Sequence, residues 1–161
     1  MTTLGEAAIA IALSYEGVHE TEGHDRGPEI DMFLRSQGLP PGNPWCASFV
    51  CFCIMHAAKA LKIQPKFQYG GSVYKLWTRN PELRIAKPDY NCVFLLDHGL
   101  SQGGSRIGHT GFVIGPGEIP GTLETMEGNT NAAGSRTGGK AMHRSRKMEE
   151  FTKGYGFLLI G

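Results

Sequence analysis

The stretch PWCASFV, residues 44–50, places a cysteine where a thiol can be reactive. Asn43 is a good helix N-cap and Pro44 suits the first helical position, so Cys46 is predicted to lie in the first turn of an apolar helix over residues 45–62. Unpaired backbone N–H groups and the positive end of the helix dipole favour the thiolate there. The alternative is a small apolar residue packed in a core helix. Cys46 is therefore a candidate nucleophile.

A cysteine nucleophile needs a base within hydrogen-bond reach and a group that orients the base. His109 follows Gly108 at the predicted start of an apolar strand at a sheet edge, and the next strand ends in EGNTN, which carries Glu127 and Asn129. Alternation puts these two residues on one face of their strand, and antiparallel pairing can bring either of them beside His109. The alternatives are a surface histidine and an ordinary strand end. We favour His109 over His98, because His98 lies at the mouth of a glycine-rich hairpin loop, where a base is harder to position.

The remaining ligand-type residues match no metal-binding pattern. The loop HETEGHD, residues 19–25, contains two histidines and three acidic residues, but it lacks a helical i,i+4 histidine pair and zinc-type Cys/His spacing. We interpret it as a solvated loop. Cys51 and Cys53 form a C-x-C on the same helix as Cys46 and are interpreted as core packing. The sequence thus predicts no metal and no cofactor.

Composition narrows the class of protein. With 161 residues, 40% of them hydrophobic, and a net charge of +1, the chain is predicted to form one domain over residues 1–161 without the basic surface that nucleic acid requires. The N-terminal segment lacks a basic leader and a long apolar run, so neither a signal peptide nor membrane insertion is expected. Four cysteines form no disulfide framework at this length, which indicates reduced thiols and synthesis in the cytoplasm.

Periodicity and turn residues predict helices first and strands afterwards, which is an α+β fold. The N-terminal helices, with the cysteine helix at the centre, are expected to pack on a C-terminal antiparallel sheet. The expected helices cover residues 4–16, 28–38, 45–62 and 72–80, the expected strands cover 92–97, 109–115, 122–128, 140–148 and 155–161, and the glycine-rich residues 129–139 are expected to form a loop.

Three motifs in the same order, PWCASFV, GHTGFVI and EGNTN, resemble those of the cysteine, histidine-dependent amidohydrolase/peptidase (CHAP) family. The similarity reaches upstream to DRGPEIDMFLRSQGLPPGNPWC and downstream to HRSRK, so it covers most of the chain. It implies a papain-like α+β fold in which Cys46 is the nucleophile, His109 its base, Glu127 the group that orients the imidazole, and Asn129 the residue that completes the site. Some members bind calcium in an aspartate-rich loop before the cysteine. The corresponding GLPPGNP contains no acidic residue, so the resemblance implies no calcium here.

The resemblance also implies the substrate, bacterial peptidoglycan, in which an amide bond would be cut by an N-acetylmuramoyl-L-alanine amidase or by a stem-peptide or crossbridge endopeptidase. We expect a monomer that acts on the cell wall after release, as a phage-type lysin. An injected antibacterial toxin and a non-catalytic wall-binding module are the alternatives. No H-E-x-x-H motif supports a zinc hydrolase, and Ser48 and Ser72 lack the sequence context of a serine nucleophile. Trp45 is assigned to substrate binding as a wall of the groove, with a core anchor as the alternative.

The backbone N–H of Cys46 is the expected oxyanion donor, together with one further group. This role conflicts with the expected cap, because an Asn43 side chain bonded to that N–H would compete with the oxyanion.

Overall fold

The computed structural model describes residues 1–104, 106–130 and 139–161, and it confirms the α+β class. Within these residues the helices and strands are α1 (Leu4–Ser14), α2 (Pro28–Ser36), α3 (Cys46–Leu61), α4 (Val73–Arg79), η1 (Pro81–Leu83), β1 (Arg84–Ile85), β2 (Cys92–Leu100), β3 (Arg106–Pro116), β4 (Thr122–Thr130), β5 (Lys140–Lys147), η2 (Met148–Lys153) and β6 (Gly154–Leu159). The strands form one antiparallel sheet in the order β1-β6-β2-β3-β4-β5, so β3 lies in its interior.

The first two helices begin where local sequence sets them. The hydroxyl of Thr3 accepts a hydrogen bond from the backbone N–H of Glu6 at 3.1 Å, and the Glu6 carboxylate accepts one from the backbone N–H of Thr3 at 2.8 Å. This is the predicted capping box. Helix α2 starts at Pro28, as expected from the fixed φ of proline and its missing N–H.

The start of the cysteine helix differs from the prediction. Helix α3 begins at Cys46 with Trp45 as its N-cap residue, and it receives no side-chain cap. The Asn43 side chain instead donates to the backbone carbonyl of Pro40 at 2.9 Å. The expected competition between Asn43 and the oxyanion for one N–H is therefore absent. Helix α3 ends at Lys62, which adopts the left-handed conformation typical of a C-cap.

All five predicted strands are present, with shifted ends. β2 and β3 reach further into their connecting hairpin than expected, to Leu100 and from Arg106. β1 was missed because its two residues are too short to produce a pattern. Of the predicted loop 129–139, the first two residues belong to β4, and residues 131–138 lie outside the part of the chain that the structure describes.

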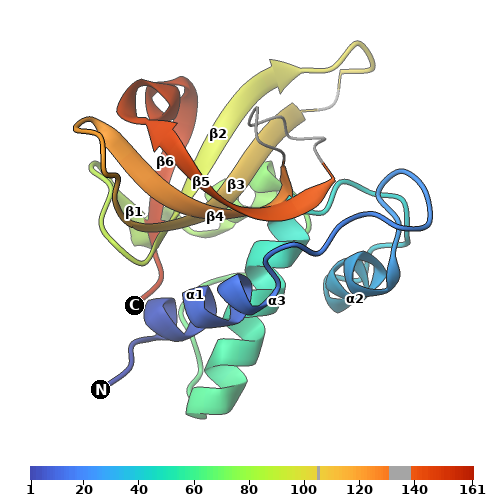
Figure 1. The fold of residues 1–161 in the computed structure, drawn as a ribbon, viewed down its shortest axis with the longest axis horizontal. Helices are drawn as coiled ribbons and strands as arrows, with labels where there is room; N and C mark the ends of the chain where they lie inside the picture. The colour runs from blue at the N-terminus through green and yellow to red at the C-terminus, as the bar shows by residue number, and fades with distance from the viewer. Residues whose placement is uncertain (105, 131–138) are drawn as a thin grey trace.

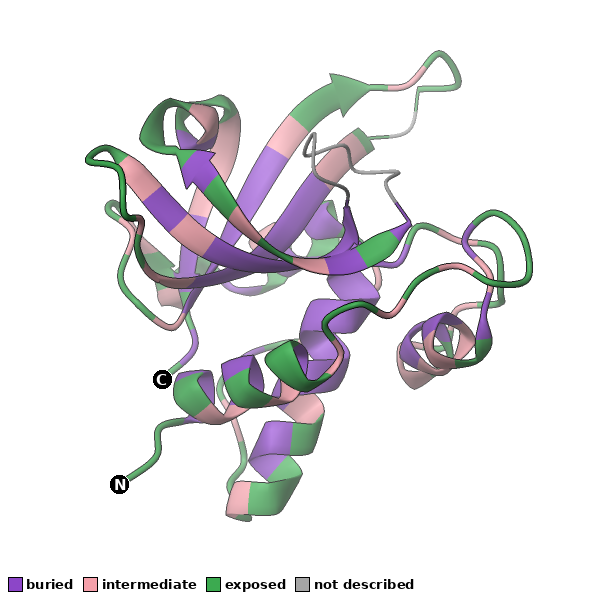
Figure 2. Cartoon of the chain, viewed as in Figure 1, coloured by how far each residue is buried: buried purple, intermediate pink, exposed green. Residues whose placement is uncertain are grey.

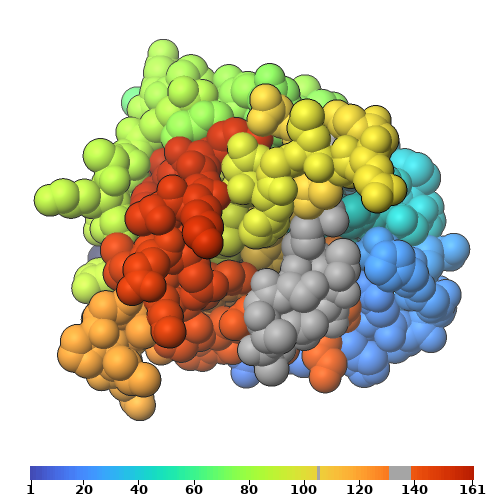
Figure 3. Space-filling model, turned by 90° about the horizontal axis from the view of Figure 1, so that it is seen from above, coloured from blue at the N-terminus to red at the C-terminus, as the bar shows by residue number. Residues whose placement is uncertain are grey.

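The central strands of the sheet carry buried residues on both faces, and α1 and α3 cover one of these faces (Figures 1 and 2). Val93 and Leu95 of β2 face the helices, whereas the alternate residue Phe94 belongs to a smaller cluster that includes Phe151 of η2. The turn between β3 and β4, residues 117–121, projects from the corner of the molecule far from α2 (Figures 1 and 3). None of the helices in the described ranges has the length and hydropathy needed to cross a membrane.

Candidate active site

Cys46 stands at the N-terminal end of the central helix and lines a pocket. Its side chain lies at the first residue of α3 and is 5% exposed, next to a cavity of about 430 Å³. The cavity lies between the start of α3, the loop before α4 and the beginning of β3. The sequence predicts Cys46 in the first helical turn, and the structure puts this turn at the rim of the cavity.

The other cysteines of α3 lie in the core. Burial raises the pKa of the Cys51 thiol to about 12, although the backbone carbonyl of Gly70 accepts its hydrogen bond at 3.4 Å. Burial also raises the pKa of Cys53 well above its ordinary value. A thiol with such a pKa stays protonated at neutral pH, so neither residue is suited to act as a nucleophile.

His109 occupies a more interior position than the sequence suggested. The prediction of a strand start at a sheet edge was wrong: β3 begins at Arg106, and His109 pairs with Leu96 of β2. β3 is flanked by β2 and β4 in the sheet, and His109 is fully buried. His98, the rival base, is exposed near the end of β2.

The His109 ring is held by Glu127, the first of the two partners that the sequence offered. Nε2 of His109 and Oε1 of Glu127 are 2.8 Å apart, and both side chains are fully buried. Gly111 makes room for the carboxylate, because a Cβ at this position would lie 2.8 Å from Cγ of Glu127. Any side chain at Gly111 would therefore displace the group that orients the imidazole.

A buried arginine, which sequence reasoning missed, fixes Glu127 in turn. Arg146 of β5 donates from Nε to Oε2 at 2.6 Å and from Nη2 to Oε1 at 2.7 Å, and the hydroxyl of Thr125 donates to Oε2 at 2.6 Å. Each oxygen of Glu127 thus accepts two hydrogen bonds. The segment HRSRK contains this arginine, but only the pairing of β4 with β5 determines which of its basic residues faces Glu127.

These contacts set the charge of the buried groups. Burial opposes ionisation of Glu127, but hydrogen bonds and charges from Arg146 and His109 outweigh it and hold the pKa of this carboxyl well below its usual range. Burial likewise opposes the imidazolium form of His109, yet hydrogen bonding to Cys46 and then to Glu127, together with their negative charges, raises the pKa of His109 to about 9. At neutral pH the pair is carboxylate and imidazolium.

Cys46 and His109 interact electrostatically, and the second ring nitrogen is the one open to the thiol. Nε2 is engaged by Glu127, so Nδ1 is the nitrogen that remains for the thiol. Nδ1 is buried and has no hydrogen bond of good geometry, whereas the side chain of Cys46 contributes to the raised pKa of His109 through hydrogen bonding and charge. Sulfur is a weak hydrogen-bond acceptor, so the charge of the thiolate is what Cys46 contributes most directly to the imidazolium. Acidic and basic side chains therefore alternate along the row of ionisable groups formed by Cys46, His109, Glu127 and Arg146.

Asn129 is the second partner that the sequence offers for His109. Among the described residues, no hydrogen bond joins Asn129 to His109. Its amide donates to Oδ1 of Asp25 at 3.4 Å and its oxygen accepts from the backbone N–H of Gly139 at 3.3 Å. It is fully buried, with a left-handed φ of 55° that asparagine tolerates. Asn129 thus ties the end of β4 to the loop after α1, and Glu127 is the residue placed to orient His109.

Trp45 is a core residue, and its assignment to substrate binding was wrong. Its side chain is 0% exposed and stacks on Phe33 with ring centroids 5.9 Å apart. Its indole N–H donates to Oε2 of Glu20 at 3.2 Å. No face of the ring remains for a substrate, so Trp45 anchors the start of α3 from within.

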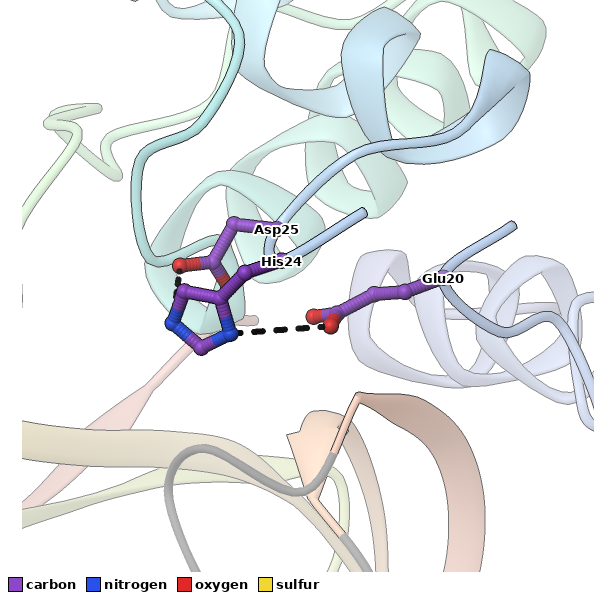
Figure 4. A group of neighbouring side chains, drawn as sticks. All are labelled: Glu20, His24 and Asp25. Carbon is purple, nitrogen blue, oxygen red and sulfur yellow. Dashed lines mark ion pairs between the residues drawn. The ribbon is translucent and has the colours of Figure 1, made fainter. Parts of the chain in front are cut away.

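The loop after α1, which the sequence predicts to be solvated, brings together three metal-type ligands. Glu20, His24 and Asp25 each offer an atom within 4.8 Å of the others (Figure 4). The His24 ring is 3.2 Å from Asp25 and 3.9 Å from Glu20 and is 70% exposed, whereas the Asp25 side chain is 4% exposed. These carboxylates also serve Trp45 and Asn129, so the group has structural partners. Its residue types suit a divalent cation, yet its internal bonds satisfy it without one.

Comparison of the chain with models of known protein families, with curated proteins and with solved structures gave no match. The resemblance to the CHAP family therefore rests on the three sequence motifs.

Proposed function

We propose that this chain is a cysteine-dependent hydrolase that cleaves an amide bond of bacterial peptidoglycan. The observation that carries the proposal is the buried pair of His109 and Glu127, 2.8 Å apart, next to a cysteine that opens onto a pocket. A hydrophobic core has no need of a buried ion pair, which costs desolvation. Perturbed, coupled ionisable groups at a cavity are typical of active sites.

The chemistry follows from the protonation states. The Cys46 thiolate attacks the amide carbonyl carbon and forms a C–S bond, while the backbone N–H of Cys46 donates to the developing oxyanion. The imidazolium of His109 then gives its Nδ1 proton to the leaving amine as the C–N bond breaks. Neutral His109 next removes a proton from water, whose oxygen attacks the thioester carbon; the C–S bond breaks and releases the acid, which restores the thiolate and the imidazolium. Glu127 keeps the ring oriented throughout, and Arg146 keeps Glu127 ionised and in place.

The substrate class rests on the resemblance to the CHAP family. It supports a papain-like arrangement, with the nucleophile at the end of the central helix and the base on the sheet, and it supports peptidoglycan as the polymer. Both bond types remain candidates, the N-acetylmuramoyl-L-alanine amide and the peptide bonds of stem or crossbridge. Release as a phage-type lysin is our first proposal for delivery, and injection as a toxin is the second. A wall-binding module without activity would have no use for the buried ion pair beside Cys46.

The test is a zymogram on purified cell walls with mass spectrometry of the released fragments. We expect clearing by the parent protein and none by Cys46→Ala or Cys46→Ser, while Cys51→Ala still clears because Cys51 only fills the core. The fragments identify the bond. Clearing by a folded Cys46→Ala variant would eliminate the thiol mechanism, and no clearing by the folded parent on any wall type would eliminate the substrate.

A further inference from the structure

The pocket beside Cys46 is charged on one side. Three basic side chains contribute to its lining, Lys75 and Arg79 from α4 and Arg106 from β3, and no acidic residue lines it within the described ranges. Cys46 lines the same cavity. A concave site lined by one sign of charge concentrates ligands of the opposite charge, because the surrounding protein screens the field less than water does.

The three cations differ in how firmly they are held. Arg79 donates from Nη1 to the backbone carbonyl of Tyr69 at 2.6 Å, which fixes one edge of its guanidinium. Arg106 lies over the Tyr74 ring at 5.0 Å and is 3.7 Å from Asp97. This ion pair is long and partly exposed, so it leaves Arg106 able to bind another anion. Lys75 is exposed on the same helix face as Arg79, one turn earlier.

The groove continues beyond the nucleophile. A second hollow shares Ser72, Val73, Arg106 and Gly108 with the first and extends to Tyr74 and Tyr155. Arg106 therefore stands at the junction of the two hollows, where a ligand that passes Cys46 would meet its guanidinium. This placement suits a carboxylate on a chain that continues into the second hollow.

We propose that this basic groove binds a carboxylate of the substrate and so selects acidic peptides for attack by Cys46. The inference deepens the proposed function and rests on it for the identity of the peptide, because stem peptides carry free carboxylates in some walls and carboxamides in others. The existence of an anion subsite at Cys46 rests on the pocket alone. A substrate with a free carboxylate near the scissile amide is then cleaved faster than its carboxamide analogue.

The first experiment uses two small probes of nearly equal shape, iodoacetate and iodoacetamide. In both, the Cys46 thiolate forms a C–S bond and displaces iodide, so only the charge of the probe differs. The measured quantity is the labelling rate with iodoacetate divided by the labelling rate with iodoacetamide. This ratio should fall roughly threefold to tenfold in Arg106→Gln and in Lys75→Gln, and in the parent it should fall as salt rises. The matched controls Arg84→Gln and Lys87→Gln remove one charge each from a different hollow and should leave the ratio unchanged. His109 is present in every variant, so its own attraction for the anion cancels.

The second experiment compares cleavage of two synthetic stem peptides that differ only in a free carboxylate or a carboxamide. The expected result is a higher kcat/KM for the free acid, with the preference reduced in Arg106→Gln. A labelling ratio that is the same in the parent, the groove variants and the controls would overturn the anion subsite, even if both peptides are cut. A ratio that responds to the groove variants, with neither peptide nor purified walls cut, would support the subsite and defeat the proposed function. Equal cleavage of both peptides despite a responsive ratio would overturn the selection of acidic peptides.

Discussion

The molecule contains two histidine–glutamate pairs with the same atom-to-atom distance and very different surroundings. His109 and Glu127 are 2.8 Å apart, and so are His143 of β5 and Glu124 of β4. The first pair is fully buried. In the second, the exposed fractions of the side chains are 45% and 26%, and no third charged group is seen to join the pair in the described part of the chain.

The difference shows that contact distance does not identify a site. Water screens the exposed pair, which has little effect on stability and none on reactivity. In the buried pair, Glu127 is compensated on one side by Arg146 and on the other by His109, and Cys46 is the next ionisable group. The buried pair therefore holds a charge in a fixed position beside a thiol, which the exposed pair cannot do.

Replacing each histidine by alanine should separate the pairs most strongly. His109→Ala removes both the proton donor and the partner of the thiolate, so wall lysis should fall by about 10²- to 10⁴-fold. Alkylation of Cys46 near neutral pH should slow as well, since the imidazolium favours the thiolate. The rates of clearing and of iodoacetamide labelling measure the two effects.

The controls for this comparison are His143→Ala and His98→Ala, both at exposed positions. We expect each to retain the parent's lysis and labelling rates. Slow labelling in His98→Ala together with unchanged labelling in His109→Ala would reverse the assignment of the base.

Removing the cation that compensates Glu127 should have the next largest effect. Arg146→Met leaves the buried carboxylate of Glu127 with His109 as its one ion-pair partner among the described residues, so the free energy of unfolding should drop by about 3–5 kcal/mol. Adding Glu127→Gln to this variant should recover part of the loss, because the uncompensated charge is gone. Urea unfolding followed by circular dichroism measures both variants.

The matched control is Glu124→Gln in the exposed pair, which should change the free energy of unfolding by less than about 1 kcal/mol. An Arg146→Met variant as stable as the parent would show that Glu127 does not need its cation.

The residue types of the buried site could be predicted from the sequence, whereas their burial and their further partners could not. Cys46, His109 and Glu127 carry their chemistry in residue type and order, and local caps such as that of Thr3 are read directly from the chain. Arg146 and the burial of Trp45 depend on which strands and helices pair, which is fixed by contacts between distant segments. The glycine-rich hairpin residues before His109 predict that the strand starts at this histidine. In the structure, the pairing of β2 with β3 extends further into the hairpin, to Arg106.

The charge of His109 should make stability depend on pH in a defined window. Its pKa is raised to about 9 in the folded state, above the ordinary value of about 6.5 expected in the unfolded chain. Its contribution is therefore fully present below about pH 6.5 and is lost as the pH rises through about 9. The difference in free energy of unfolding between the parent and His109→Asn should shrink over this interval.

A double measurement keeps this prediction specific. Urea unfolding of parent and His109→Asn at pH 6, 8 and 10 reports on the histidine together with the Cys46 thiol coupled to it, because groups that do not interact with His109 cancel to first order. A difference that is constant across the three pH values would show that His109 is neutral when folded, and the imidazolium–thiolate pair would then have to be abandoned.

The smallest effects on stability and lysis are expected in a third group of histidine and carboxylates, formed by Glu20, His24 and Asp25 (Figure 4). His24 is mostly exposed, so His24→Ala should cost less than about 1 kcal/mol and spare lysis. Asp25→Ala should cost more, because it takes an acceptor from the buried amide of Asn129.

Chelation with EDTA should leave lysis and the thermal midpoint unchanged, whereas a thiol alkylating agent should abolish lysis. If EDTA lowers activity and calcium or zinc restores it in the parent but not in His24→Ala, the loop is a metal site, and the internal bonds of Glu20 and Asp25 are not sufficient to hold it.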